Sequence, residues 1–321
     1  MFEQNTLFDL GPRLPTTRDI ALMVREGGEE ALTEAQRRAD AARYQEIQCR
    51  AALNRTAGMP FNWTLNPYRG CTHACHYCFA RKYQHQLELG AGDTFSSLIL
   101  VKVNLVDVLK KELDKPSWTR EQVAVGTATD PYQPIEGHYK LTRRALQGLA
   151  AARTPIGLVT KGPMVVRDID VLQELTRQAS CTIYMSVPTV DEAIWSELEP
   201  GTAHPLQRLR AVRKLNAAGI RAGVLVNPLV PGFSTRRKVL SRTLEAIADH
   251  GAAFAGMNTM YLDGGTRQHF MGFLEETHPL MRRRYERLYA KKYVAKNYGN
   301  LVRKRFDALR HLHGLAARHR D

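Results

Sequence analysis

The sequence predicts an α/β protein built on a parallel sheet. From residue 61 onward, short apolar segments rich in β-branched residues alternate with segments of helical periodicity. The expected strands are nearly continuous in apolar residues, which is typical of a parallel sheet covered by helices. A repeated order of strand and then helix favours an α/β fold.

Six strand-and-helix units fit between residues 60 and 250, fewer than the eight of a closed barrel. The expected strands are Phe61–Leu65, Ser97–Val103, Gln122–Thr127, Ile156–Thr160, Thr182–Val187 and Ala222–Val226. The expected helices include Leu105–Leu113, Thr142–Ala152, Asp168–Gln178 and Leu206–Ala217. A seventh strand is expected within Ala252–Leu262.

Several helix ends carry recognisable signals. Asn104 stands where it can cap the helix that begins at Leu105. The run Thr189–Glu192 fits a capping box, in which a threonine and a glutamate three residues later satisfy the first backbone N–H groups of a helix. Gly219 can end the helix before the sixth strand.

The chain divides into three expected parts. Residues 1–55 read as an N-terminal extension, partly helical over Glu29–Leu53, where Ala, Glu, Gln and Arg predominate. Residues 56–265 hold the alternating units, and residues 266–321 form a basic, mainly helical C-terminal region. Together, 321 residues are enough for one large domain with appendages or for two smaller domains.

The composition is that of a globular protein, with 44% hydrophobic and 24% charged residues and without low-complexity tracts. No apolar run reaches the roughly 18 residues that a membrane span needs, so we expect a soluble protein without a membrane partner. The first ten residues lack the basic and apolar parts of a secretion signal. Five cysteines, three of them clustered, do not form a disulfide framework. A cytoplasmic location is the expectation.

Positive charge is concentrated near the C-terminus. Residues 281–321 contain thirteen Lys or Arg and three Asp or Glu, which accounts for ten of the +14 formal charges of the chain. Such a field favours a polyanionic partner, and the expected one is DNA or RNA. A membrane surface and an acidic protein are the alternatives.

Tyr285, Tyr289 and Tyr293 recur every four residues within this basic region. On one helix they would share a face. Rings among cations can stack on exposed bases, but they can also pack the helix against the rest of the protein. We favour packing for the rings and attraction of nucleic acid for the charges.

Three cysteines, Cys71, Cys75 and Cys78, lie together in one short loop after the first strand, and no fourth cysteine is near them. Thiolates suit a soft metal centre such as an iron–sulfur cluster. A four-iron cluster held by three protein thiolates leaves one iron open to another ligand, and an open position indicates chemistry. Because His73 and His76 lie between the cysteines, zinc is the alternative metal, although paired zinc knuckles are missing.

The spacing Cys-x3-Cys-x2-Cys, with Tyr77 before the last cysteine, resembles the signature of the radical SAM enzymes. The runs 66–81, 126–136 and 160–162 are similar to the branch that contains spore photoproduct lyase and photolyase-like proteins. The resemblance implies a partial (β/α)6 barrel of the TIM type and a [4Fe-4S] cluster whose open iron binds S-adenosylmethionine. It also implies reductive cleavage of the sulfonium to a 5′-deoxyadenosyl radical, with an electron donor such as flavodoxin or ferredoxin.

In such folds the loops after successive strands converge on one face. The candidate cofactor-binding residues that this rule and the resemblance select are Tyr77, Lys102, Thr127, Asp130, Lys161 and Ser186. Lys161 is suited to the carboxylate of S-adenosylmethionine and Ser186 to its amino acid or ribose groups. A lysine at a strand end can instead extend into water, and the Asp130-Pro131 pair can mark an ordinary turn.

The first functional hypothesis is a radical SAM enzyme that acts on nucleic acid, with lyase-like or repair chemistry. The lyase has a hydrogen-donating cysteine some forty residues after its cluster motif, whereas this chain has none between Cys78 and Cys181. Tyr132 and Cys181 are the candidate substitutes. The alternatives are a radical SAM enzyme for a protein, peptide or metabolite, and a non-enzymatic zinc or iron–sulfur module that binds nucleic acid.

Overall fold

The structure of the protein is a computed structural model that describes residues 42–87, 92 and 94–317. Most of the expected N-terminal extension, including residues 29–41 of its helix, lies outside the described residues. Within the described part, β1 (Arg43–Ile47) and β2 (Leu53–Arg55) are strands, so the prediction of a helix up to Leu53 is wrong there. Both strands pair with β-strands from later in the chain, and this pairing overrides the helical propensity of their residues.

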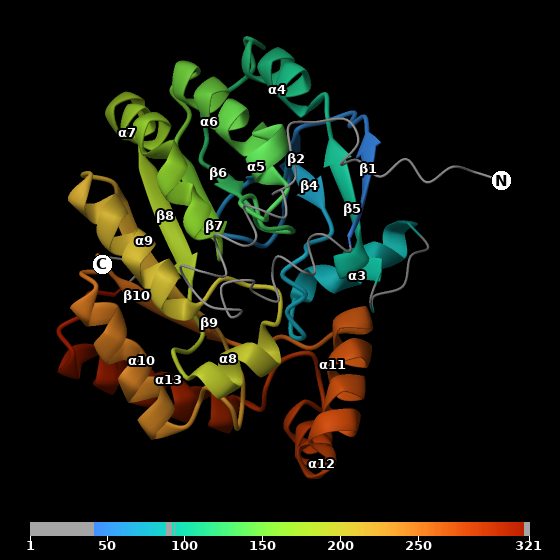
Figure 1. The fold of residues 1–321 in the computed structure, drawn as a ribbon, viewed down its shortest axis with the longest axis vertical. Coiled ribbons are helices and arrows are strands. Elements are labelled where there is room, and N and C mark those ends of the chain that lie inside the picture. Colours follow the sequence, from blue (N-terminus) through green and yellow to red (C-terminus); the bar gives the residue numbers. More distant parts are fainter. Residues whose placement is uncertain (1–41, 88–91, 93, 318–321) are drawn as a thin grey trace, which may run out of the picture.

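A seven-stranded sheet forms the centre of the molecule (Figure 1). Its spatial order is β10-β9-β8-β7-β6-β3-β2. Its strands are β2, β3 (Trp63–Leu65), β6 (Val123–Val125), β7 (Ile156–Thr160), β8 (Cys181–Ser186), β9 (Arg221–Leu229) and β10 (Ala255–Thr259). All neighbours pair in parallel except β2, which is antiparallel to β3. Since β10 and β2 are the two edges and do not pair with each other, the barrel is open, and the predicted α/β partial barrel is confirmed.

One predicted strand lies elsewhere. The segment expected as the second barrel strand forms β5 (Leu98–Lys102), which pairs with β1 and with β4 (Tyr68–Arg69) in a separate three-stranded sheet. Alternate residues Ile99 and Val101 of β5 are buried in a small core with Tyr68. The sixth parallel strand of the main sheet is therefore β10, which the sequence predicted as a seventh.

Helices follow the strands and cover the sheet. They are η3 (Phe79–Leu87), α3 (Thr94–Ser97), α4 (Leu105–Leu113), α5 (Glu136–Tyr139), α6 (Leu141–Ala151), η4 (Pro163–Asp168), α7 (Ile169–Gln178), α8 (Glu192–Leu198), α9 (Pro205–Ala217) and α10 (Arg237–Asp249). In Figure 1, α6, α7, α9 and α10 succeed one another along the outside of the strands. Apolar side chains of these helices join those of the strands in the largest core.

The capping predictions meet mixed results. Asn104 precedes α4, but its side chain caps no helix and instead pairs with the backbone of Cys49. Helix α8 is capped by Asp191, which accepts from the N–H of Ile194, so the cap lies two residues later than the predicted Thr189. Gly219, with φ of +78°, follows the end of α9 as predicted.

Three helices complete the chain: α11 (Gly264–Thr277), α12 (Pro279–Leu288) and α13 (Lys296–Leu312). Tyr285 and Tyr289 are buried, and their hydroxyls donate to the carbonyls of Pro231 and Met260 at 2.7 and 2.9 Å. Their rings therefore pack the region against the barrel, as we favoured. Tyr293 is 62% exposed because α12 ends at Leu288, so the three tyrosines do not share one helix face. Among the described residues, no helix is long and apolar enough to cross a membrane.

Candidate functional site

The cysteine loop follows β3 and β4, at the carboxyl end of the main sheet. Cys71 and Cys75 are buried and Cys78 is partly buried. Burial raises the pKa of all three thiols, that of Cys75 to about 12. The three groups also raise one another's pKa values through their charges, which places them in mutual electrostatic reach. A bound metal centre would deprotonate such thiols by coordinating them.

Arg81 holds the loop from within. Its side chain is 1% exposed and lies over the ring of Phe95, 4.9 Å from the ring centroid. The guanidinium donates to the carbonyls of Cys75, Ala74 and Gly92 at 3.2, 3.0 and 2.9 Å. These contacts fix the backbone between the second and third cysteines.

The segment after β6 holds the start of the loop. The hydroxyl of Thr129 donates to the carbonyl of Gly70 at 2.6 Å. The side chain of Gln133 accepts from the N–H of Thr72 at 3.2 Å and donates to Thr129 at 3.1 Å. This segment, which the sequence marked as a rigid polar loop, therefore positions the cysteine loop through its backbone.

A third contact comes from the chain after α8. The N–H of Gly201 donates to the carbonyl of His73 at 3.1 Å, and that of His76 donates to Leu198 at 3.1 Å. A side chain at Gly201 would overlap the carbonyl oxygen of Thr72, so only glycine lets the two backbones approach this closely.

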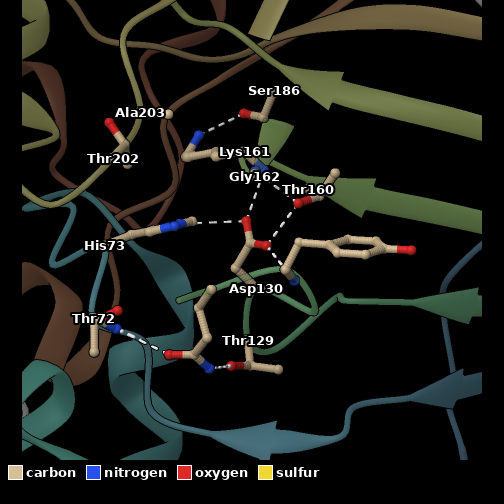
Figure 2. Close-up of polar contacts among 12 residues, drawn as sticks. Thr72, His73, Thr129, Asp130, Thr160, Lys161, Gly162, Ser186, Thr202 and Ala203 are labelled. Carbon is tan, nitrogen blue, oxygen red and sulfur yellow. Dashed lines mark hydrogen bonds and ion pairs between the residues drawn. The ribbon is translucent and has the colours of Figure 1, made fainter. Parts of the chain in front are cut away.

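Asp130 is the centre of a buried polar cluster (Figure 2). Its carboxylate accepts from the hydroxyl of Thr160 at 2.6 Å and from the N–H groups of Lys161 and Tyr132 at 2.7 and 2.9 Å. It also lies 3.4 Å from Nδ1 of His73. Burial raises the pKa of Asp130, but His73 and the hydrogen bonds outweigh burial and lower the pKa to about 2. Asp130 is thus an anion that ties β7 to the cysteine loop.

Lys161 and Ser186 meet at the ends of β7 and β8, as the sequence predicted for neighbouring strand ends. The ammonium of Lys161 donates to the hydroxyl of Ser186 at 2.6 Å, a contact visible in Figure 2. Ser186 in turn donates to the carbonyl of Asn227 at 3.0 Å. The ammonium also lies 5.6 Å from the centre of the Tyr77 ring, within cation–π range.

Glu199 completes this group and was not predicted. Its carboxylate is 3.0 Å from the ammonium of Lys161 and 2.6 Å from the guanidinium of Arg208, and it accepts from the hydroxyl of Tyr77. Burial raises the pKa of Glu199, but the two cations and the hydrogen bonds lower it to about 2. No sequence signal marks Glu199, because it follows a short helix and reaches the site only through tertiary packing.

The remaining predicted residues lie at different places. Lys102, in the small sheet, donates to the carbonyl of Asn66 at 2.8 Å and is not among the contacts of Lys161. Asn66 also accepts from the N–H of Ala128, so this lysine supports the join between the cysteine loop and the segment after β6. Thr127 is half-buried at the start of that segment.

The donors that a zinc site would need point elsewhere. His73 faces Asp130, while Nδ1 of His76 lies 3.1 Å from Nε2 of His269, and the ring of His76 stacks on Phe273. Over the described residues, no three His, Cys, Asp or Glu side chains are gathered around a point where one ion could bind. An iron–sulfur cube takes each thiolate at a separate iron, so it fits donors that surround a larger group.

Neither candidate hydrogen donor faces the cysteine loop. Cys181 is the first residue of β8, at the amino end of the strand, and it is buried in the apolar core. Burial raises its pKa to about 12. The hydroxyl of buried Tyr132 donates to Asp168 at 3.0 Å. Both side chains therefore serve the structure.

An open parallel α/β barrel with three cysteines in the loop after its first parallel strand defines a class of enzyme, one that uses an incompletely ligated iron–sulfur cluster. The chain belongs to the radical SAM superfamily, whose family model matches residues 65–240. Members use a [4Fe-4S] cluster and S-adenosylmethionine, and these are the cofactors of this chain. The residues to hold the cluster are Cys71, Cys75 and Cys78.

Relatives and solved structures agree with this assignment. An uncharacterized protein of Mycobacterium tuberculosis is 37% identical over 285 residues, which cover 88% of this chain and 84% of the relative. A radical SAM Nα-GlyT isomerase of Pseudomonas phage M6 is 28% identical over 53% of this chain and 33% of its own length. Spore photoproduct lyase complexed with dinucleoside spore photoproduct has the same fold, with a TM-score of 0.64, 16% identity and coverage of 86% and 82% of the two chains.

Proposed function

We propose that this protein cleaves S-adenosylmethionine reductively at its cluster and uses the resulting radical on a nucleic acid, DNA before RNA. The observation that carries the proposal is the cysteine loop, clamped on several sides and placed beside the Lys161, Ser186 and Glu199 group. When bound, the cluster and S-adenosylmethionine supply an electron and a 5′-deoxyadenosyl group that can abstract hydrogen.

In this proposal Lys161 and Ser186 bind the amino acid part of S-adenosylmethionine. The ammonium of Lys161 lies between Ser186, Glu199 and the Tyr77 ring, which keeps it charged and restricts its rotamers. Tyr77 shapes the base of the site through its bond to Glu199. Asp130 positions the backbone of Lys161, while Thr127 and Lys102 act on the neighbouring loop.

Charge and relatedness support a nucleic acid as substrate. The formal charge of +14, concentrated near the C-terminus, attracts a polyanion through counterion release. The structural neighbour spore photoproduct lyase is described with a dinucleoside lesion bound, which supports lyase-like or repair chemistry. The phage relative is named an isomerase, so isomerisation is the second candidate reaction.

The setting follows from the cofactor. Radical SAM enzymes need an electron donor, and we propose a flavodoxin or ferredoxin. We also propose the cytoplasm as the compartment, because a reducing environment protects thiolates and clusters from oxidation.

The test is anaerobic reconstitution of the full chain with iron and sulfide, followed by S-adenosylmethionine and a chemical reductant. The proposal predicts the absorbance of an iron–sulfur cluster and formation of 5′-deoxyadenosine, with higher turnover when DNA carrying pyrimidine lesions is added. Zinc in place of iron, without 5′-deoxyadenosine, would support the binding-module alternative. Formation of 5′-deoxyadenosine that responds to peptides or metabolites and not to DNA or RNA would support the other enzyme alternative.

A further inference from the structure

Two exposed aromatic rings lie beside the cysteine loop and have no role so far. Among the residues that the structure describes, Phe79 and Tyr293 are the only Phe, Tyr or Trp side chains that are exposed, at 41% and 62%. Phe79 directly follows Cys78. Exposed rings that gather near an active site are a common feature of binding surfaces.

Contacts join these two rings into one surface, the aromatic–lysine patch, formed by Phe79, Lys82, Tyr83, Tyr261, Lys292 and Tyr293. The ammonium of Lys82 lies 5.2 Å from the ring centres of Tyr83 and Tyr261 and 6.0 Å from that of Phe79. Tyr261 packs edge-on against Tyr293 with 5.2 Å between centroids, and Lys292 lies 5.8 Å from the Tyr293 ring. The patch therefore alternates ring faces with cations.

The patch connects the two ends of the open sheet. Phe79 to Tyr83 belong to η3, which follows the cysteine loop near the β3 end of the sheet, whereas Tyr261 follows β10 at the other edge. A backbone bridge ties Tyr261 to Tyr293, so the exposed ring is held in place. A ligand on this surface would thus lie next to the cysteine loop, where the barrel is open.

We propose that the aromatic–lysine patch binds unpaired bases of a single DNA strand and guides them to the cluster. This proposal rests on the proposed function and adds the surface that holds the substrate. Base stacking on aromatic rings combined with lysines near the backbone is the physical basis of single-strand binding. One acid, Asp263, is present, and it accepts from the Tyr261 hydroxyl at 2.7 Å while facing Lys82 and Lys292. The patch thus keeps an excess of positive charge, and the Tyr261 hydroxyl is already engaged and does not select for a ribose 2′-OH.

Anisotropy of a fluorescent 12-residue DNA strand, measured with the reconstituted protein, tests the proposal. Stacking on one ring contributes about 1–3 kcal/mol per base, so Tyr293→Ala should weaken binding at least about fivefold. Tyr293→Phe keeps the ring and should bind within about twofold of wild type. The matched control Leu312→Ala changes another exposed apolar side chain, 74% exposed at the end of α13, and should leave binding unchanged.

Salt and the form of the nucleic acid refine the test. Lys292→Gln should reduce the dependence of log K on log salt by about 0.7 if it contacts one phosphate of a single strand. Duplex DNA should bind more weakly than the single strand, because its bases are already stacked. Wild-type protein that binds DNA while Tyr293→Ala binds equally well would overturn the patch alone. Wild-type protein that binds no DNA would overturn the nucleic-acid substrate too, and binding to RNA without DNA would overturn the choice of DNA.

Discussion

The ammonium of Lys161 at the end of β7 forms a 3.0 Å ion pair with Glu199, a buried carboxylate 38 positions later in the sequence. Arg208 binds the other oxygen of the same carboxylate at 2.6 Å. One anion thus holds two buried cations beside the cysteine loop, and it also accepts from Tyr77, which lies inside that loop. The geometry of the proposed S-adenosylmethionine site therefore depends on a residue outside the family motifs.

Replacing Glu199 should damage both stability and the site. Glu199→Ala leaves Lys161 and Arg208 without their shared anion, and breaking a buried pair in this way costs about 3–5 kcal/mol of unfolding free energy. Glu199→Gln keeps the shape and should fold better while binding S-adenosylmethionine more weakly. Chemical denaturation and titration with S-adenosylmethionine measure the two effects. The control is Glu197→Gln, at a half-buried carboxylate that pairs with His278 away from the site. Equal behaviour of the Glu199 and Glu197 variants would refute a special role for Glu199.

Each cysteine of the loop should be indispensable for the cluster. Changing Cys71, Cys75 or Cys78 to alanine removes one iron ligand, so bound iron should fall and 5′-deoxyadenosine formation should drop to background. Iron and sulfide analysis of anaerobically reconstituted protein checks the first effect, and chromatography of the products checks the second. Cys181→Ala is the matched control and should retain both, since Cys181 lies in the apolar core. Wild-type turnover in any of the three loop variants would contradict the assignment.

Gly201 should tolerate no side chain. In Gly201→Ala the new methyl group would lie 2.9 Å from the carbonyl carbon of His73 and overlap the carbonyl of Thr72, which forces the cysteine loop to shift. Overpacking of this kind costs about 1–3 kcal/mol, and we expect slower cluster uptake as well. Gly272→Ala is the control, because nothing lies within 4 Å of its added carbon and alanine favours the α11 helix. Thermal unfolding and the rate of iron uptake distinguish the two variants.

Acid should destabilise the protein through two carboxylates. The pKa values of Asp130 and Glu199 are lowered to about 2, below the ordinary values of about 4. Their stabilising effect is therefore complete above about pH 4.5 and is lost as the pH falls through 2, on the order of 2–3 kcal/mol for each group. Denaturation of protein prepared without iron, between pH 6 and 3, should show this decline. In Glu199→Gln the decline should be smaller, whereas an equal decline would argue against the contribution of Glu199.

Local patterns predicted much of the fold. Apolar runs identified the segments of β3, β5, β6, β7, β8 and β9, and helical periodicity identified α4, α6, α7 and α9. Such patterns report burial along a segment, and they do not report which strand it will pair with. For that reason the segment of β5 was predicted in the barrel, although its hydrogen bonds go to β1 and β4. The segment after residue 43 was predicted as a helix for the same reason.

The sequence by itself determined the three cysteines, the parallel α/β class and the candidates Lys161 and Ser186, because spacing within one loop and positions at strand ends are local properties. Only the tertiary structure decided that Glu199, Arg208 and Gly201 serve this site and that Phe79 and Tyr293 share one surface. These residues come from separate turns and helices, and backbone hydrogen bonds and ion pairs between distant segments bring them together. Contacts of this kind leave no periodic trace in the chain.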